Sequence, residues 1–171
     1  MKKPLIFLAS LGIASTLLAS QSAAEADREI SKLATLHQQV FAFDASKLRT
    51  PGVVFWTAWN EEVLLGCAAL QELSPTQGEV KSMRTPATLR RHGAGRALLN
   101  HILQVARERG YRELFLETGS HSAFTSAQTL YRSVGFRECG PFGAYKENGF
   151  SVFMSLNLGG EPGLTSSCSG P

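Results

Sequence analysis

The chain has 171 residues, of which 43% are hydrophobic and 18% charged, a composition that suits one compact domain with its own core and makes a second domain unexpected. No segment is long enough to require a membrane span. The net charge is only +3, and the arginines crowd between Arg84 and Arg112, so a phosphate-bearing ligand accounts for them better than nucleic acid does.

The N-terminus has the three parts of a secretory signal. Lys2 and Lys3 precede an uncharged run over residues 4–20, and small residues follow, with cleavage expected after Ala24 or Ala26. The pattern predicts export to the periplasm or the exterior. The alternatives are a buried or uncleaved N-terminal segment and a misplaced start.

Residues 27–52 offer one amphipathic helix and no convincing strand. Its apolar positions recur at helical spacing: Ile30, Leu33, Leu36 and Val40. A strand before residue 53 is therefore either absent or supplied by part of the run from Leu5 to Leu18.

The next segment reads as β-structure. Residues 53–59 and 63–70 are β-rich runs, and residues 60–62 between them form a hairpin loop of acceptable length. A turn at residues 74–78 leads into a third strand over residues 79–84. We therefore expect three consecutive antiparallel strands.

The hexad from Arg90 to Gly95 follows this strand and opens an amphipathic helix that should stop at Gly110. Its two glycines let a bulky phosphate approach free backbone N–H groups, and the helix dipole and the arginines favour negative charge there. The hexad lacks the Gly-Lys-Ser/Thr ending of a P-loop, and it lacks the third glycine and tight turn of a Rossmann fingerprint. It predicts a pyrophosphate site of another kind.

Beyond Gly110 a strand, a helix and a final strand complete the pattern. Residues 113–118 should pair in parallel with residues 79–84 through a right-handed crossover. A second helix is expected from Ala127, and the alternating run over residues 150–156 should close an antiparallel edge of a mixed sheet.

Two motifs stand in a fixed order along the chain. Arg-x-x-Gly-x-Gly, from Arg90 to Gly95, lies between a strand and a helix, and Leu-Tyr-x-x-x-Gly-Phe, from Leu130 to Phe136, closes the second helix. Together they resemble the acetyl-CoA loop and the closing signature of small bacterial members of the GNAT family of N-acetyltransferases. The resemblance extends from about Val53 to Leu158. The chain departs from the commonest family pattern at Phe124, where many members carry an asparagine that contacts the cofactor.

The resemblance implies an α/β fold with one mixed sheet flanked by helices. In this fold the two central parallel strands splay apart, and the pantetheine arm of the coenzyme enters the gap and pairs with the strand over Val80–Arg84. It also implies three parts of the chain: a signal-like segment over residues 1–26, the acetyltransferase domain over 27–158, and a disordered tail over 159–171.

The implied activity is transfer of an acetyl group from acetyl-CoA, a cosubstrate, to a primary amine of a small molecule or peptide by direct attack in a ternary complex. Two alternatives stay open: a non-catalytic acyl-CoA-binding or sensor domain, and an exported binding module on the same scaffold. The cysteines lack metal-ligand spacing, so no metal is expected. Acetyl-CoA is cytosolic, which favours a cytoplasmic location and conflicts with the secretory signal. The acceptor and a homodimer also stay open.

The reaction needs a route for the ammonium proton, a donor for the tetrahedral oxyanion and an acid for the departing thiolate. The resemblance implies Tyr131 as the acid, and Glu79 or Glu117 is the expected base, acting through a water. The backbone N–H near Met83 is the expected oxyanion donor. The full set of expected cofactor-binding residues is Met83, Arg84, Arg90, Arg91, His92, Gly93, Ala94, Gly95 and Arg96.

Overall fold

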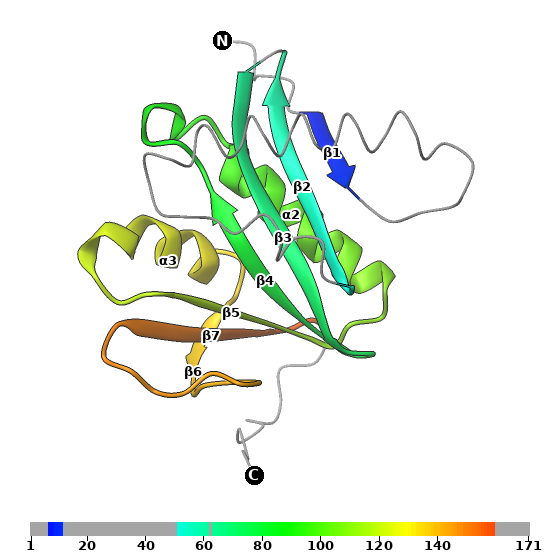
Figure 1. Ribbon diagram of the computed structural model, residues 1–171, viewed down its shortest axis with the longest axis vertical. Coiled ribbons are helices and arrows are strands. Elements are labelled where there is room, and N and C mark those ends of the chain that lie inside the picture. Colours follow the sequence, from blue (N-terminus) through cyan, green and yellow to red (C-terminus); the bar gives the residue numbers. More distant parts are fainter. Residues whose placement is uncertain (1–6, 12–50, 62, 160–171) are drawn as a thin grey trace.

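The computed structural model describes the backbone of residues 7–11 and, with their side chains, residues 51–61 and 63–159. Within these ranges seven strands form one mixed sheet in the order β1-β2-β3-β4-β5-β7-β6 (Figure 1). The strands are β1 Phe7–Leu11, β2 Val53–Asn60, β3 Val63–Ser74, β4 Gln77–Arg84, β5 Glu113–Gly119, β6 Arg137–Cys139 and β7 Ser151–Asn157.

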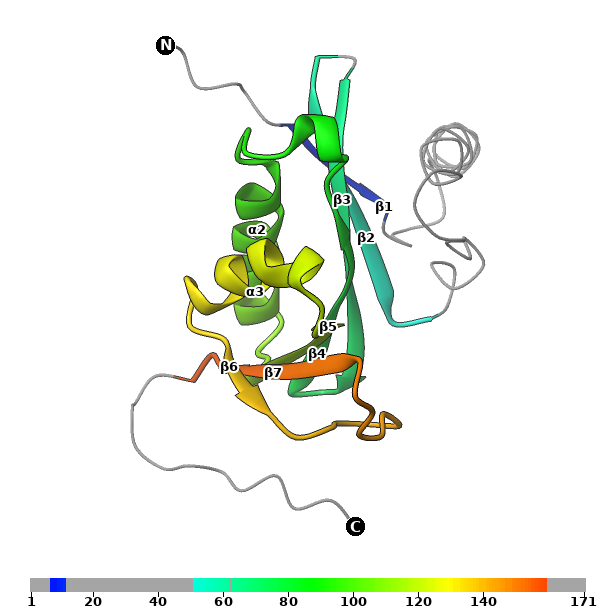
Figure 2. The ribbon, with the colours of Figure 1, turned by 90° about the vertical axis from the view of Figure 1, so that its left-hand side faces the viewer.

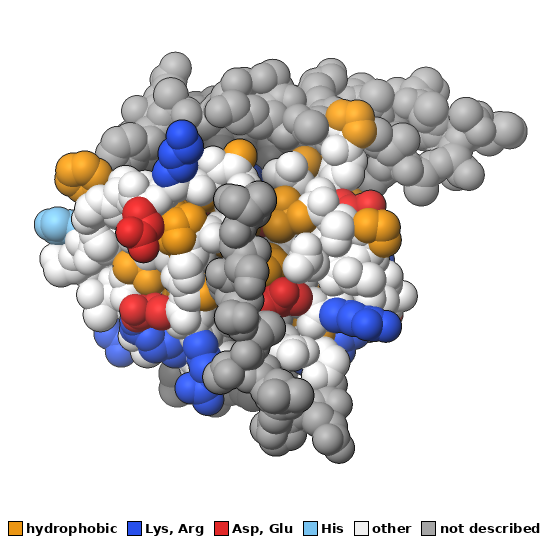
Figure 3. All heavy atoms as spheres, turned by 90° about the horizontal axis from the view of Figure 1, so that it is seen from below, with side chains coloured by type: hydrophobic (Ala, Val, Ile, Leu, Met, Phe, Trp, Pro, Cys, Tyr) orange, Lys and Arg blue, Asp and Glu red, His pale blue; other side chains and the backbone are white. Residues whose placement is uncertain are grey.

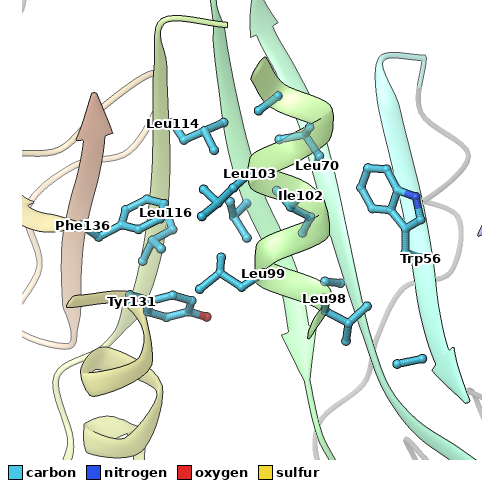
Figure 4. Packing of buried hydrophobic residues seen from close by; sticks show 14 of the residues in the cluster. Trp56, Leu70, Leu98, Leu99, Ile102, Leu103, Leu114, Leu116, Tyr131 and Phe136 are labelled. Atoms are coloured by element: carbon cyan, nitrogen blue, oxygen red, sulfur yellow. The ribbon is translucent and has the colours of Figure 1, made fainter. Parts of the chain in front are cut away.

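Two α-helices lie on the same side of this sheet, as Figure 2 shows. They are α2 Ala94–Glu108 and α3 Thr125–Arg132, preceded by the short 3-10 turns η2 Ala87–Leu89 and η3 Ser122–Phe124. The apolar stripe of α2 faces the sheet, so that Leu98, Leu99 and Ile102 are fully buried in the core (Figure 4). Gly110 adopts a left-handed φ of 75° just past this helix, as its predicted stop position requires.

The predicted strand pairings are largely confirmed. β2, β3 and β4 are consecutive antiparallel strands, and β4 pairs in parallel with β5. The prediction that the last strand closes an edge is wrong, because β7 pairs with β5 on one side and with β6 on the other. β6 has only three residues, too few to give a periodic signal in the sequence.

A first strand exists, and it comes from the apolar N-terminal run. β1 pairs antiparallel with β2, from Phe7 opposite Trp59 to Leu11 opposite Phe55. Of the two alternatives left by the sequence, the one in which part of the Leu5–Leu18 run supplies this strand is confirmed. The expected helix over residues 30–40 and the tail beyond residue 159 lie outside the described residues.

The two parallel strands separate halfway along their length. Their paired residues run from Gln77–Val80 on β4 and from Glu113–Leu116 on β5. Beyond these pairs β4 continues beside β3, whereas β5 continues beside β7, and the two strands diverge (Figure 1). The expected splay of the central strands is therefore confirmed.

Candidate active site

A β-bulge at Ser82 reorganises β4 where the strands part. Cys67 pairs with Arg84 and Ala69 pairs with Lys81, so β4 holds one residue more than β3 between these pairs. Ser82 occupies this bulge with a left-handed φ of 52°. Because of the extra residue, the next side chain, Met83, packs against the same core as Val80.

The loop before α2 ends in a helix start that no side chain caps. Gly93, the residue before the helix, has a left-handed φ of 88° and no side chain within 4 Å of the position where a Cβ would lie. The first helical hydrogen bond runs from the Ala97 amide to the Gly93 carbonyl. Within the described part of the chain, the amides of Ala94, Gly95 and Arg96 therefore have no helical acceptor, and the first turn contains no acidic residue.

Gly95 lies deeper than Gly93. A Cβ at Gly95 would lie 3.4 Å from Leu130 Cδ2 on α3 and 3.6 Å from Met83 Cε on β4. These contacts bring together the start of α2, β4 and α3, the three elements that carry the predicted site residues on this side of the sheet. The loop, the bulged strand and the second helix meet at this glycine.

The arginines around this helix start are exposed. Arg84 ends β4, Arg90 and Arg91 lie in the loop, and Arg96 lies in the first turn of α2. His92 supports the loop from within, because its Nδ1 lies 3.0 Å from the Arg90 carbonyl and donates to it in the matching tautomer. All predicted phosphate-binding residues thus fall around one helix N-terminus, where the dipole favours an anion.

Tyr131 is a buried phenol on α3. Its ring packs edge-on against Phe136 at 6.0 Å and extends towards α2 (Figure 4). Burial raises the pKa of the Tyr131 hydroxyl to about 12, against a smaller opposing effect of the Arg84 charge. The hydroxyl makes no hydrogen bond within the described residues, so a protonated donor is left available on this side of the sheet.

Glu79 is enclosed by two partners. Its side chain is 4% exposed, and Lys81 Nζ lies 3.0 Å from both carboxylate oxygens. The Tyr145 hydroxyl donates to Glu79 Oε1 at 2.7 Å, and Lys81 donates to the same hydroxyl at 3.2 Å. We call these three side chains the Glu79 network. Lys81 and Tyr145 thus occupy the printed contacts of this carboxylate, and the role of Glu79 as a base acting through a water stays a prediction.

Glu117 stands apart from this network. It is exposed on β5, past the last pair with β4, and its Oε1 accepts a hydrogen bond from the Ser151 hydroxyl. Phe115, two residues earlier on the same face of β5, lies opposite Glu79. The two predicted bases therefore share a face of the sheet but have different surroundings, one enclosed and one open.

The loop between β6 and β7 carries Tyr145 over this face. Phe142 stacks on Phe115 with ring centroids 4.8 Å apart, and Tyr145 packs on Phe142 at 5.0 Å and on Phe153 at 5.6 Å. The sequence predicts no catalytic residue in this loop. The Glu-x-Lys spacing of Glu79 and Lys81, which puts both side chains on one face of a strand, was the available signal for the network.

An open pocket of about 520 Å³ lies beside this loop. Its lining residues are Glu138, Cys139, Glu147, Asn148, Gly149, Ser151, Val152 and Phe153. Three of them, Glu147, Asn148 and Gly149, come from this loop, and the others come from β6 and β7.

The splayed strands, the bulge and the uncapped helix start agree with comparisons to known proteins. The model of the acetyltransferase (GNAT) family matches residues 18–136. The chain belongs to the GNAT family. Over 121 residues it is 46% identical to the uncharacterized N-acetyltransferase YsnE of Bacillus subtilis, covering 71% of this chain and 80% of that protein. The GNAT protein is thus an acetyltransferase.

Solved structures share its fold. The ribosomal-protein-S18-alanine N-acetyltransferase of Escherichia coli superposes with a TM-score of 0.65 at 18% identity, covering 92% of this chain and 97% of that one. A GNAT acetyltransferase from Elizabethkingia anophelis with acetyl-CoA bound gives a TM-score of 0.56 at 18% identity, covering 89% and 97%. None of the helices in the described ranges combines the length and apolar character needed to cross a lipid bilayer.

Proposed function

We propose that this GNAT protein transfers an acetyl group from acetyl-CoA to a primary amine of a small molecule or peptide, by direct attack within a ternary complex. The observation that carries the proposal is the separation of β4 from β5 after Val80, next to the uncapped start of α2. A bound acetyl-CoA in the Elizabethkingia anophelis protein of the same fold supports it.

The chain offers complementary groups for each part of the coenzyme. The pairing of β4 with β5 ends at Val80, and within the described residues no strand pairs with Lys81–Met83 on that side, which suits the amide groups of a pantetheine arm. The free amides of Ala94–Arg96 suit a pyrophosphate, because each can donate and the helix dipole adds favourable potential. The exposed arginines add charge that suits the same phosphates.

Four groups fill the three chemical roles. The backbone N–H near Met83, beside the bulge, is the proposed donor to the oxyanion. Tyr131 donates a proton to the departing thiolate, and its raised pKa keeps the phenol protonated at neutral pH. Glu79 and Glu117 are the proposed bases, on the face opposite α2.

The loop face supports an amine acceptor. The pocket beside the β6–β7 loop includes two carboxylates, Glu138, which forms an ion pair with Arg132, and Glu147, next to the apolar Phe153. Figure 3 views the molecule from the end where β6 and β7 lie, and acidic side chains stand between hydrophobic ones on that surface. Such a surface matches an ammonium group joined to an apolar body.

The decisive experiment separates binding from turnover. Isothermal calorimetry with CoA tests the coenzyme site, and thiol release from acetyl-CoA in the presence of primary amines tests the transfer. Binding together with amine-dependent release is the expected result. Tight binding without release for any amine would instead favour a sensor domain, and absence of both would reject the proposed coenzyme site.

A further inference from the structure

The Glu79 carboxylate is the most enclosed ionisable group of the candidate site. Its side chain is 4% exposed, whereas that of Lys81 is 34% exposed and Tyr145 is half-buried. A substrate amine therefore reaches Glu79 only through one of its two partners. The question is which partner can pass on a proton.

Lys81 is unsuited to accept one. Burial lowers the pKa of Lys81, but the hydrogen bond and the charge of Glu79 outweigh burial, and the net pKa is raised. The Lys81 side chain thus stays an ammonium ion at neutral pH and has no free lone pair to accept a proton. Its positive charge does have a use, because it disfavours a second ammonium nearby and so favours the neutral form of an arriving amine.

Tyr145 has the geometry of a relay. Its hydroxyl donates to Glu79 Oε1 at 2.7 Å and accepts from Lys81 Nζ at 3.2 Å, so the oxygen keeps one lone pair for a donor from another direction. Stacking on Phe142 and Phe153 fixes the ring, which limits the hydroxyl to this position. Lys81 is the first residue of β4 beyond its pairs with β5, so the network stands where the two strands begin to separate.

We infer that Tyr145 is a catalytic residue that carries the acceptor's proton to Glu79, an inference that rests on the proposed acetyl transfer. When the amine nitrogen has bonded to the thioester carbonyl carbon, it bears a positive charge and an extra N–H. That N–H bond breaks as its proton passes to Tyr145 Oη. In the same step the phenol's own proton moves to Glu79 Oε1, which becomes a neutral carboxylic acid, and Lys81 stays an ammonium ion.

The test compares two matched tyrosines. Tyr145→Phe removes the hydroxyl but keeps the ring that packs on Phe142. Tyr111→Phe is the control, because the Tyr111 hydroxyl also donates to a glutamate, Glu72 Oε2 at 3.0 Å, away from the separated strands. The probes are spermidine, tryptamine, L-phenylalanine and a tripeptide with a free N-terminus, each with acetyl-CoA, and the fastest is used for kinetics.

We expect Tyr145→Phe to lower kcat by about 100-fold, with KM for the amine and Kd for CoA within about threefold of wild type. Tyr111→Phe should leave kcat unchanged. Glu79→Gln should also be slow, and the double variant Tyr145→Phe/Glu79→Gln should be no slower than the slower single one, because both changes break one relay.

Different results would overturn the acetyl transfer and the Tyr145 relay. A wild-type protein that releases no thiol with any probe overturns the acetyl transfer and the relay with it. Wild-type turnover with a Tyr145→Phe variant of equal kcat overturns the relay alone. Losses that multiply in the double variant also overturn it, since the two residues would then act separately.

Discussion

Gly119 lies directly beneath the ring of Phe124: a Cβ at Gly119 would lie 2.4 Å from Phe124 Cδ2. The Gly119 carbonyl also accepts a hydrogen bond from Gln128 Nε2 of α3 at 2.8 Å. The end of β5 and the start of the second helical segment are therefore in close contact. Phe124 occupies the position where many GNAT members carry asparagine, and the absence of a side chain at Gly119 makes room for its ring.

We expect Gly119→Ala to destabilise the protein by about 1 kcal/mol, because the added methyl overlaps the Phe124 ring, which is 44% exposed and can shift part of the way. Chemical unfolding monitored by circular dichroism measures the change. The double variant Gly119→Ala/Phe124→Ala should lose less than the sum of the two single changes. Additive losses would mean that the contact with Phe124 is not the cause.

Gly93→Glu should weaken CoA binding by more than 100-fold, measured by calorimetry. The new carboxylate repels phosphate at the helix start, and its backbone would be strained at a φ of 88°. Gly110→Glu is the matched control, because Gly110 has a φ of 75°, has open space around it and follows the other end of α2. Equal losses in the two variants would point to strain and not to phosphate repulsion.

Tyr131→Phe should lower kcat by about 100-fold and leave CoA binding unchanged, because the phenol is the proposed acid for the thiolate. Near-wild-type turnover would reject this role. Stopped-flow or steady-state thiol release gives the rate, and calorimetry gives the Kd.

The same residue gives a prediction for alkaline stability. The pKa of Tyr131 is about 12 in the folded protein and about 10 in the unfolded chain, so the folded state holds the proton more tightly. Its contribution, about 3 kcal/mol, is fully present below pH 10 and is lost as pH rises to 12. Tyr131→Phe should therefore flatten the fall in unfolding free energy between pH 10 and 12. An equally steep fall in the variant would assign the loss to other groups, such as the buried Cys67 thiol, whose pKa burial also raises to about 12.

Removal of residues 1–26 should cost stability, because it removes β1 and exposes the edge of β2. We expect the 27–171 form to unfold at a lower temperature and to associate in size-exclusion chromatography, and a form lacking only residues 1–5 to behave as the full chain. An equally stable, monodisperse 27–171 form would mean that β1 is dispensable. Intact-mass analysis of cell fractions then decides between a secretory signal that is cleaved and an N-terminus that stays with a cytoplasmic enzyme.

Much of the fold follows from periodicity. The hairpin, the crossover and the helix after Gly95 were predictable because alternating and helical patterns mark them directly. The bulge at Ser82 was not, since a serine with a left-handed φ carries no sequence signature. β6 escaped notice because three residues are too few to alternate.

The candidate site also has parts that the sequence predicts and parts that it does not. The glycine-containing loop before α2 was predictable because its residues are contiguous, and its binding of phosphate stays a prediction. Tyr145 was not, because it reaches Glu79 across 66 positions from a loop without periodicity. The packing of Phe142 on Phe115 and of Tyr145 on Phe153 holds that loop against the sheet.

The extra residue at Ser82 lets one strand, β4, contribute side chains to both faces of the sheet. Up to Lys81, β4 presents Glu79 and Lys81 to the face of the sheet opposite α2, which is the proposed acceptor side, and immediately after the bulge it turns Met83 towards the core that α2 covers. Shortening the strand by this single residue would reverse the orientation of everything that follows it, so a deletion there should uncouple the two substrates even if each still binds.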